Sequence, residues 1–226
     1  MTGTTTPAPS GTLWLHVGTH KTGSTSIQEA LSRRAEGLNE RGRRLLPEAN
    51  AWALANLFLR PNVCSAARML GTAGPESLKD FDEASAQVAV ALRSDRDMII
   101  SSEAFCLMRE ALEAFAIRAF FRAHFARIVP VVILRREEDW RRSREDQLRK
   151  TGLWERQRGL ADRDSADGSW YYDRGALLRF WSMIGSPQVI DYDEAMAADG
   201  SILPAFGRAI GMPDLFEGLD LRLNSR

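Results

Sequence analysis

A glycine-flanked loop near the N-terminus constrains the fold of this sequence more than any other feature. Residues 13–17, with the sequence LWLHV, form a short apolar run that is typical of a buried strand. The loop GTHKTG occupies residues 18–23, and from Ser24 onward the apolar residues recur at helical spacing. A strand, a glycine loop and a helix in this order predict an α/β domain in which the loop and the helix N-terminus bind an anion.

Strands alternate with helices along the rest of the chain. Further strands are predicted at residues 97–102, 128–134 and 189–192. Helices are predicted at residues 51–59, 80–93, 111–125, 138–150, 172–184 and 201–210. The run 128–134 is apolar throughout, which suits a central parallel strand buried on both faces. The pattern predicts an α/β, P-loop nucleotide-binding fold with a central parallel sheet covered by helices on both faces.

Length and charge narrow the function classes. The chain has 226 residues, which fits a disordered leader at 1–11 and a single domain at 12–226. The formal net charge is zero, so no global field attracts nucleic acid or an anionic membrane.

No stretch approaches the ~20 apolar residues that a membrane span needs, and residues 1–11 do not resemble a signal peptide. Cys64 and Cys106 form no CxxC pair, so we expect reduced thiols and a cytoplasmic protein.

The loop differs from the GxxxxGK[ST] pattern of nucleoside-triphosphate-binding proteins in one position. Gly18, Gly23 and Thr25 fit that pattern, but Ser24 stands where the lysine is expected, and the loop lysine is Lys21. The chemistry of anion binding survives, because backbone N–H groups, the helix dipole and Lys21 still act together on a phosphate group. The displaced lysine, and the lack of a strand that ends in a magnesium-binding Asp, argue against an ordinary ATPase.

Residues 20–25, with the sequence HKTGST, resemble the phosphate loop of the sulfotransferase family, in which the lysine precedes the second glycine. A second signature of that family is a strand that ends in Arg, followed eight positions later by Ser on the next helix. Here the strand at 131–134 leads to Arg135, and Ser143 lies eight residues further on. Arg135 would lie at the carboxyl end of a central strand, where open α/β sheets bind ligands.

The resemblance implies a donor, a reaction and a set of residues. The donor would be 3′-phosphoadenosine-5′-phosphosulfate (PAPS), used without a metal, and the acceptor a small molecule or carbohydrate. The implied donor-binding residues are Lys21, Thr22, Gly23, Ser24, Thr25, Ser26, Arg135 and Ser143.

Sulfuryl transfer needs a base for the acceptor proton and a cation for the leaving phosphate. Lys21 is the expected cation. Glu103, which follows the strand at 97–102, is the preferred base, and His20 in the loop is the alternative. Each also has a structural interpretation: Glu103 could cap the next helix or pair with an arginine, and His20 could be a hydrogen-bonded loop residue.

The segment 135–163 carries more basic than acidic residues. A solvated helix face with i,i+4 ion pairs accounts for most of them, and a role in holding an anionic acceptor is the alternative. The polar segment 151–172 is interpreted either as a lid over the acceptor or as an ordinary connection between helices. It contains Trp154, Trp170 and Tyr171.

Two other functions compete with the sulfotransferase hypothesis. The first is a P-loop kinase of small molecules, which would use Mg-ATP. The second is a non-catalytic relative, because Ser26 stands where many sulfotransferases place a tryptophan and no glycine- and lysine-rich loop is evident near the C-terminus, where Arg222 or Arg226 could substitute.

Overall fold

The structure is a computed structural model that describes residues 9–46, 51–61, 63, 96–152 and 169–219, and six positions between 82 and 92. These six positions are helical, in agreement with the helix predicted at 80–93. Most of the predicted leader at 1–11, Cys64, Trp154 and the two C-terminal arginines lie outside the described residues.

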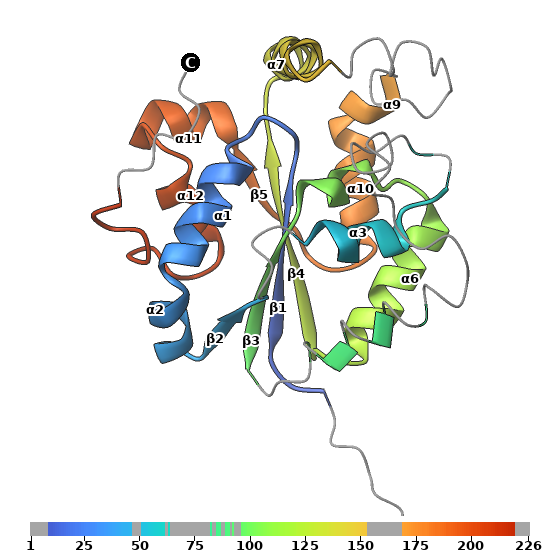
Figure 1. The fold of residues 1–226 in the computed structure, drawn as a ribbon, viewed down its shortest axis with the longest axis vertical. Coiled ribbons are helices and arrows are strands. Elements are labelled where there is room, and N and C mark those ends of the chain that lie inside the picture. The colour runs from blue at the N-terminus through green and yellow to red at the C-terminus, as the bar shows by residue number, and fades with distance from the viewer. Residues whose placement is uncertain are drawn as a thin grey trace, which may run out of the picture.

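Five parallel strands form the central sheet in the order β2-β3-β1-β4-β5 (Figure 1). Their bounds are β1 Thr12–Gly18, β2 Arg43–Leu45, β3 Asp97–Ser101, β4 Arg127–Leu134 and β5 Gln188–Asp191. Strand β1 lies in the middle, between β3 and β4, because the chain builds first to one side of it and then to the other. The predicted parallel α/β fold is confirmed.

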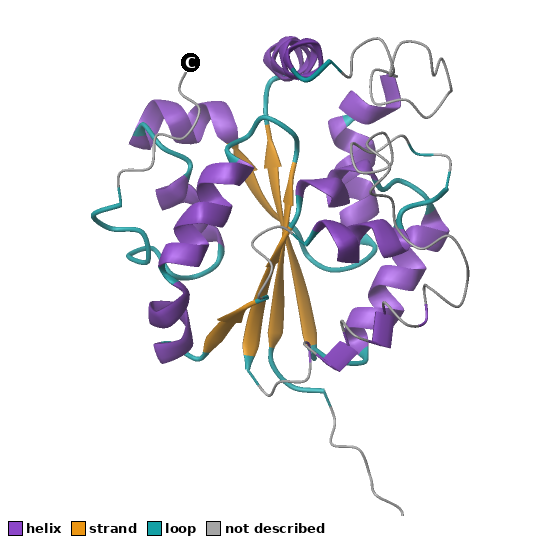
Figure 2. Cartoon of the chain, viewed as in Figure 1, coloured by secondary structure: helices purple, strands orange, loops and turns teal. Residues whose placement is uncertain are grey.

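Helices cover both faces of the sheet (Figures 1 and 2). One face carries α1 Ser24–Arg33, α2 Ala35–Glu40, α11 Tyr192–Asp199 and α12 Leu203–Ala209. The other carries α3 Trp52–Phe58, the 3-10 helix η1 Glu103–Leu107, α6 Ala111–Arg122, α9 Ser169–Tyr172 and α10 Arg174–Ser182. Helix α7, Glu137–Lys150, lies at the carboxyl end of the strands, near the loop that joins β1 to α1.

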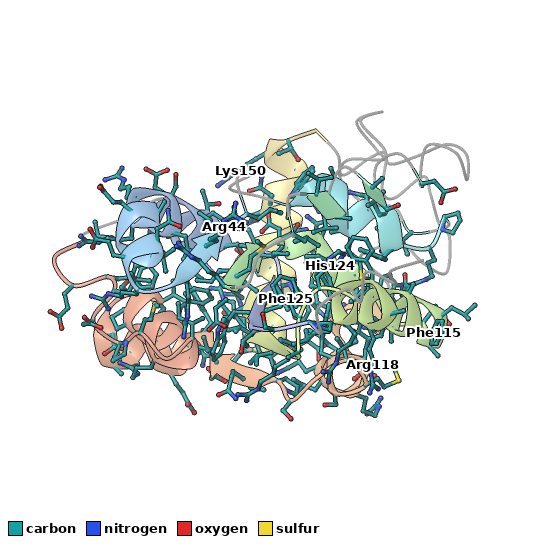
Figure 3. All side chains as sticks on the ribbon, turned by 90° about the horizontal axis from the view of Figure 1, so that it is seen from below. Arg44, Phe115, Arg118, His124, Phe125 and Lys150 are labelled. Atoms are coloured by element: carbon teal, nitrogen blue, oxygen red, sulfur yellow. The ribbon has the colours of Figure 1, made fainter. Side chains whose placement is uncertain are left out.

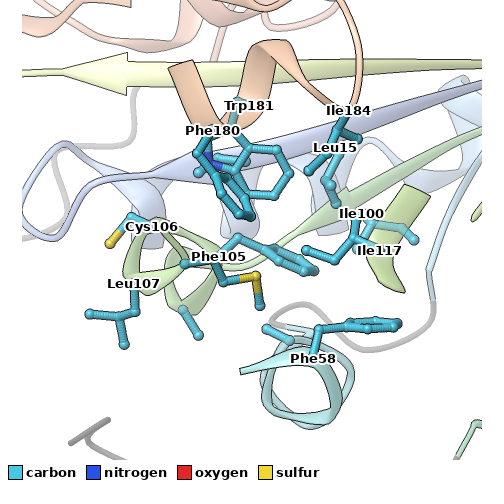
Figure 4. Packing of buried hydrophobic residues seen from close by; sticks show 14 of the residues in the cluster. Leu15, Phe58, Ile100, Phe105, Cys106, Leu107, Ile117, Phe180, Trp181 and Ile184 are labelled. Carbon is cyan, nitrogen blue, oxygen red and sulfur yellow. The ribbon is translucent and has the colours of Figure 1, made fainter. Parts of the chain in front are cut away.

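Alternate side chains of each central strand enter two separate cores, one on each face of the sheet. In β4, Val132 and Leu134 belong to one core and Val131 and Ile133 to the other. This two-sided burial is why β4 is apolar from Ile128 to its end at Leu134. Figure 4 shows the larger core, in which the Phe105 and Trp181 rings meet edge to face with their centroids 5.9 Å apart.

Aromatic residues recur at helical spacing in 111–125, at Phe115, Phe120, Phe121 and Phe125, and this spacing predicts that they pack in the core. The structure departs from that prediction at one position. Phe121 and Phe125 are fully buried, whereas Phe115 is 72% exposed and points away from the sheet (Figure 3). The buried face of α6 follows the spacing Ala114, Ile117, Phe121, and Phe115 lies on the neighbouring face. The prediction that Phe115 packs in the core was wrong.

Two of the elements that were not predicted depend on polar contacts. The three-residue edge strand β2 has little apolar signal, and Arg43 forms an ion pair with Asp97 of β3 at 3.6 Å. Helix α11 begins at Tyr192, the last residue of the predicted strand 189–192, because the Asp191 carboxylate accepts hydrogen bonds from the backbone N–H groups that follow it.

None of the helices in the described part of the chain combines the length and the hydropathy that a bilayer crossing requires.

The turn between α10 and β5 generates a prediction on stability. A Cβ atom added to Gly185 would lie 2.2 Å from the carbonyl oxygen of Ile128, so Gly185→Ala must force the turn away from β4. We expect a loss of about 1–3 kcal/mol in the free energy of unfolding, measured by urea titration. Gly37→Ala is the control, because nothing lies within 4 Å of its added Cβ, and it should be neutral or stabilise α2 slightly. Equal stabilities of the two variants would contradict this packing.

Candidate functional site

The loop between β1 and α1 has a backbone conformation that only some residues tolerate. Lys21 is the one non-glycine residue with positive φ, at 69°, among the residues that the structure describes, and Gly23 has φ of 82°. A left-handed conformation costs a non-glycine residue about 1 kcal/mol or more, so contacts around Lys21 must hold it. At Gly18, an added Cβ would lie 2.3 Å from the Ser24 hydroxyl oxygen, which explains the first glycine.

Hydrogen bonds fix the loop from within and from β4. The Thr22 hydroxyl donates to the carbonyl of Thr19 at 2.6 Å, and the Thr19 hydroxyl donates to the carbonyl of Ile133 at 3.1 Å. Thr22 was predicted to bind the donor, but its hydroxyl serves the loop itself. Any contact that Thr22 makes with a ligand therefore falls to its backbone N–H group.

The N-terminus of α1 has the properties of an anion site. Gly23 occupies the N-cap position and no side chain caps the helix, whose first intrahelical hydrogen bond runs from Ile27 N to Gly23 O at 3.0 Å. The N–H groups of the first turn therefore lack intrahelical partners. The Ser24 hydroxyl oxygen is buried and forms no well-aligned hydrogen bond with a described residue, although it lies near enough to the Glu103 carboxyl to lower its pKa. Ser26 is buried and Thr25 is exposed.

Arg135 connects the second predicted signature directly to the loop. Its Nη1 donates to the carbonyl oxygen of Lys21 at 3.1 Å. Its guanidinium carbon lies 5.2 Å from the centroid of the Tyr192 ring, and its Nε lies 3.9 Å from a carboxylate oxygen of Asp193. Ser143 lies two turns into α7 and is half-buried, and among the described residues it makes no hydrogen bond to Arg135. The structure thus brings Arg135 and Lys21 together.

The side chain of Lys21 reaches α7. Its Nζ donates to the side-chain oxygen of Gln147 at 3.3 Å. The ammonium group therefore lies between the loop and α7. Its positive charge acts on both Glu103 and His20, as does that of Arg144.

Glu103 stands at the first position of η1, directly after β3. The cap of η1 is Ser102, whose side chain accepts a hydrogen bond from Ala104 N at 3.3 Å, and not Glu103. Glu103 also forms no ion pair with any described residue. Burial raises the pKa of the Glu103 carboxyl, and the positive charges of Arg144 and Lys21, with the nearby Ser24 hydroxyl, oppose that rise. A half-buried carboxyl without an ion pair, beside two cations, is suited to accept a proton.

His20 is held by its Nδ1 atom. This nitrogen is hydrogen-bonded to the Tyr171 hydroxyl and lies 3.4 Å from the sulfur of Cys106. Burial, followed by the charges of Arg144 and Lys21, lowers the pKa of His20 well below 6.5, so the imidazole is neutral. Burial raises the pKa of Tyr171 and brings that of Cys106 to about 11, so both neighbours keep their protons. This favours Nδ1 as the acceptor and places the imidazole hydrogen on Nε2.

Tyr171 is a residue that the sequence had placed only in a possible lid. Arg109 fixes it by donating from Nη2 to the Tyr171 carbonyl at 3.1 Å and from Nη1 to the Cys106 carbonyl at 2.6 Å. The Trp140 ring packs on it with the centroids 4.8 Å apart. Helix α9 is therefore held against η1, and the Tyr171 hydroxyl belongs to the site.

Arg144 was missed as a site residue. The sequence had assigned the charges of α7 to a solvated face, and the Arg141–Glu137 ion pair at 2.8 Å confirms that assignment for the outer face. Arg144 is only 5% exposed, because it continues the inward-facing series Trp140, Arg144, Leu148 at i, i+4 and i+8. That helical spacing of one arginine between two large apolar residues was the signal available in the sequence.

Among the described residues, no group of three or more His, Cys, Asp or Glu side chains is arranged to hold a metal ion.

The fold and the loop define a parallel α/β protein of the P-loop-like class. No protein-family model matches the chain, and no curated protein sequence matches it. A solved sulfotransferase from Alicyclobacillus acidocaldarius superposes with a TM-score of 0.55 at 13% identity, covering 96% of this chain and 87% of that one. The sulfotransferase domain from the curacin biosynthetic pathway is 13% identical, with 97% and 82% coverage and a TM-score of 0.46. The chain has a sulfotransferase-like fold.

A buried histidine beneath the loop gives a prediction on pH. The Nδ1 atom of His16 lies 2.8 Å from the Ser101 hydroxyl, and burial lowers the pKa of His16 to about 3. Below pH 6.5 His16 is protonated in the unfolded chain but stays neutral in the folded protein. The free energy of unfolding must therefore fall as the pH falls from 6.5 towards 3. The slope is at most about 1.4 kcal/mol per pH unit for one such group.

His16→Asn should flatten this dependence by one proton, as measured by urea unfolding between pH 5 and 7. His20, whose pKa is also lowered, adds to the slope, and Glu103, whose pKa is raised, opposes it, and both contributions are the same in the two proteins. Identical slopes for wild type and His16→Asn would show that His16 protonates in the folded state.

Proposed function

We propose that this protein is a sulfotransferase that moves a sulfuryl group from PAPS to a hydroxyl or amine of a small-molecule or carbohydrate acceptor. The observation that carries the proposal is the hydrogen bond from Arg135 Nη1 to the carbonyl of Lys21 at 3.1 Å. Two cationic residues, one after β1 and one after the adjacent strand β4, therefore lie at the same loop. A nucleotide with phosphates on both its 3′ and 5′ oxygens needs two such cations. The sulfotransferase-like fold supports the same function.

In this proposal the loop holds the 5′-phosphosulfate of the donor. The N–H groups of the first turn of α1, the Lys21 ammonium and the Ser24 hydroxyl are available to its oxygens. Arg135 and Ser143 bind the 3′-phosphate. Asp193 lies 3.9 Å from Arg135, so the incoming phosphate must compete with that carboxylate for the guanidinium.

The transfer is an in-line displacement at sulfur. Glu103 takes the proton from the acceptor hydroxyl, an oxygen lone pair forms the new S–O bond, and the bond between sulfur and the bridging phosphate oxygen breaks. The bonding electrons go to the leaving 3′-phosphoadenosine-5′-phosphate (PAP), whose growing charge is stabilised by Lys21 and the α1 N-terminus. The products are the sulfate ester, PAP and a protonated Glu103, which releases its proton to solvent.

Glu103 is the better base of the two candidates. His20 is neutral and has its Nδ1 engaged with Tyr171, so its Nε2 carries the hydrogen and donates rather than accepts. Glu103 has a raised pKa, and it has no ion pair to give up within the described part of the chain.

A cytoplasmic location and one catalytic domain at residues 12–226 belong to the same proposal, and the free thiol of Cys106 suits a reducing compartment.

A P-loop kinase using Mg-ATP is the second candidate, because the strand–loop–helix unit suits a triphosphate as well. A non-catalytic relative is the third.

Donor binding separates these functions. We expect PAP in the presence of EDTA to raise the unfolding temperature, by an amount equivalent to about 2.7 kcal/mol at a concentration 100 times its Kd, while Mg-ATP has no such effect. Lys21→Ala should weaken PAP binding about 10-fold or more, because a charged hydrogen-bond donor to phosphate is lost. Lys150→Ala, an exposed position on α7, is the matched control. Stabilisation by Mg-ATP but not by PAP would favour the kinase. Unaltered PAP binding in Lys21→Ala would favour the non-catalytic relative.

The base assignment is tested by Glu103→Gln. Sulfuryl transfer from ³⁵S-labelled PAPS to a panel of phenols and sugars should fall about 10²-fold or more, while PAP affinity changes little, because the amide cannot take the proton. In wild type, kcat/KM should rise with pH through a pKa above that of an ordinary carboxyl. Glu138→Gln, exposed on α7, should behave as wild type. Full activity of Glu103→Gln would remove Glu103 from the mechanism.

A further inference from the structure

Arg144 is a buried cation that makes no ion pair with any residue that the structure describes. The residue is 5% exposed, and its Nε is buried without a hydrogen-bond partner in that part of the chain. Its guanidinium carbon lies 5.9 Å from the centroid of the Tyr171 ring. The carboxyl of Glu103 is close enough to feel its charge, but it forms no ion pair with the guanidinium. The other arginines of α7 whose contacts are described pair with acids: Arg141 with Glu137, and Arg142 with Asp139.

Such an arrangement is unfavourable for a protein without ligand. A charged group taken out of water needs a counter-charge or a full set of hydrogen bonds, and a guanidinium has five N–H groups to satisfy. A methionine or leucine at this position would continue the apolar series of Trp140 and Leu148 without that cost. The charge is therefore best explained by something that binds to it.

The surroundings of Arg144 are those of the proposed transfer point. Its charge is the largest electrostatic influence on Glu103 and on His20, ahead of Lys21 in both cases. The Tyr171 ring that it faces carries the hydroxyl bonded to His20. Arg144 thus lies beside the candidate base.

We propose that the Arg144 guanidinium binds a sulfate-like oxyanion next to Glu103, His20 and Tyr171. This inference rests on the proposed function and extends it. The planar fork of N–H groups matches two oxygens of a sulfonate, sulfate or carboxylate. The oxyanion is the sulfuryl group of the donor or an acidic group of the acceptor, and the two share this chemistry.

The experiment titrates inorganic sulfate onto protein saturated with PAP, so that the phosphate sites of the donor are already filled. Arg144→Met removes the charge and keeps an apolar side chain of similar length. Arg142→Met removes a guanidinium that is 74% exposed on the same helix and is the matched control. Arg144→Lys keeps the charge without the fork, and it serves as the second variant. Affinities and unfolding temperatures are measured by thermal shift and calorimetry.

We expect sulfate affinity to fall at least 10-fold in Arg144→Met, by less in Arg144→Lys, and not at all in Arg142→Met. We also expect ligand-free Arg144→Met to unfold about 3 °C or more above wild type, because an unpaired charge has left the interior. Equal sulfate affinity in Arg144→Met and wild type, or no sulfate binding by wild type, would overturn the proposal.

A comparison of PAPS with PAP, without acceptor, identifies the source of the oxyanion. If Arg144→Met weakens PAPS about 10-fold more than PAP, the guanidinium holds the sulfuryl group. If both affinities are unchanged while sulfate binding is lost, the anion belongs to the acceptor, and acidic sugars should be sulfated in preference to neutral ones. If PAP fails to bind wild type, the donor proposal fails, and sulfate titration of the ligand-free variants still tests Arg144.

Discussion

The parallel pairing of β1 with β4 is the constraint on which the candidate site depends. The register runs from Thr12 opposite Arg127 to Gly18 opposite Ile133, so both strands end at the same level. The loop after β1 and the arginine after β4 therefore emerge side by side, although they are 114 residues apart in sequence. A shift of the register by one residue would turn every side chain of β4 to the wrong core and move Arg135 away from the Lys21 carbonyl.

The parts of the molecule governed by local pattern could be predicted from the sequence. Hydrophobic periodicity and glycine placement were enough to predict the apolar run of β4 and the strand–loop–helix unit around Lys21, because helices bury β1 and β4 on both faces of the sheet. The proximity of Arg135 to the loop followed from the rule that ligands bind at the carboxyl ends of parallel strands. The edge strand β2 and the start of α11 were not predicted, because pairing to a neighbour and a capping aspartate define them.

The remaining site residues come from tertiary packing that no local pattern fixes. Tyr171 reaches His20 only because Arg109 and Trp140 hold α9 against η1. Arg144 looked like one charge among many on a polar helix, and its spacing from Trp140 and Leu148 was the one local sign that it turns inward. The neutral state of His20 likewise depends on burial by neighbours distant in sequence.

The left-handed conformation of Lys21 has a consequence for how such a scaffold can change. A glycine would relieve the strain at this position, and the loop would then be easier to form but would lack its cation. Stability and the proposed affinity for phosphate therefore place opposite demands on this residue, so selection for heat tolerance alone would tend to remove the lysine. A protein of this fold with glycine at this position would need a positive charge from another element, such as Arg135, whose guanidinium already donates to the carbonyl of residue 21.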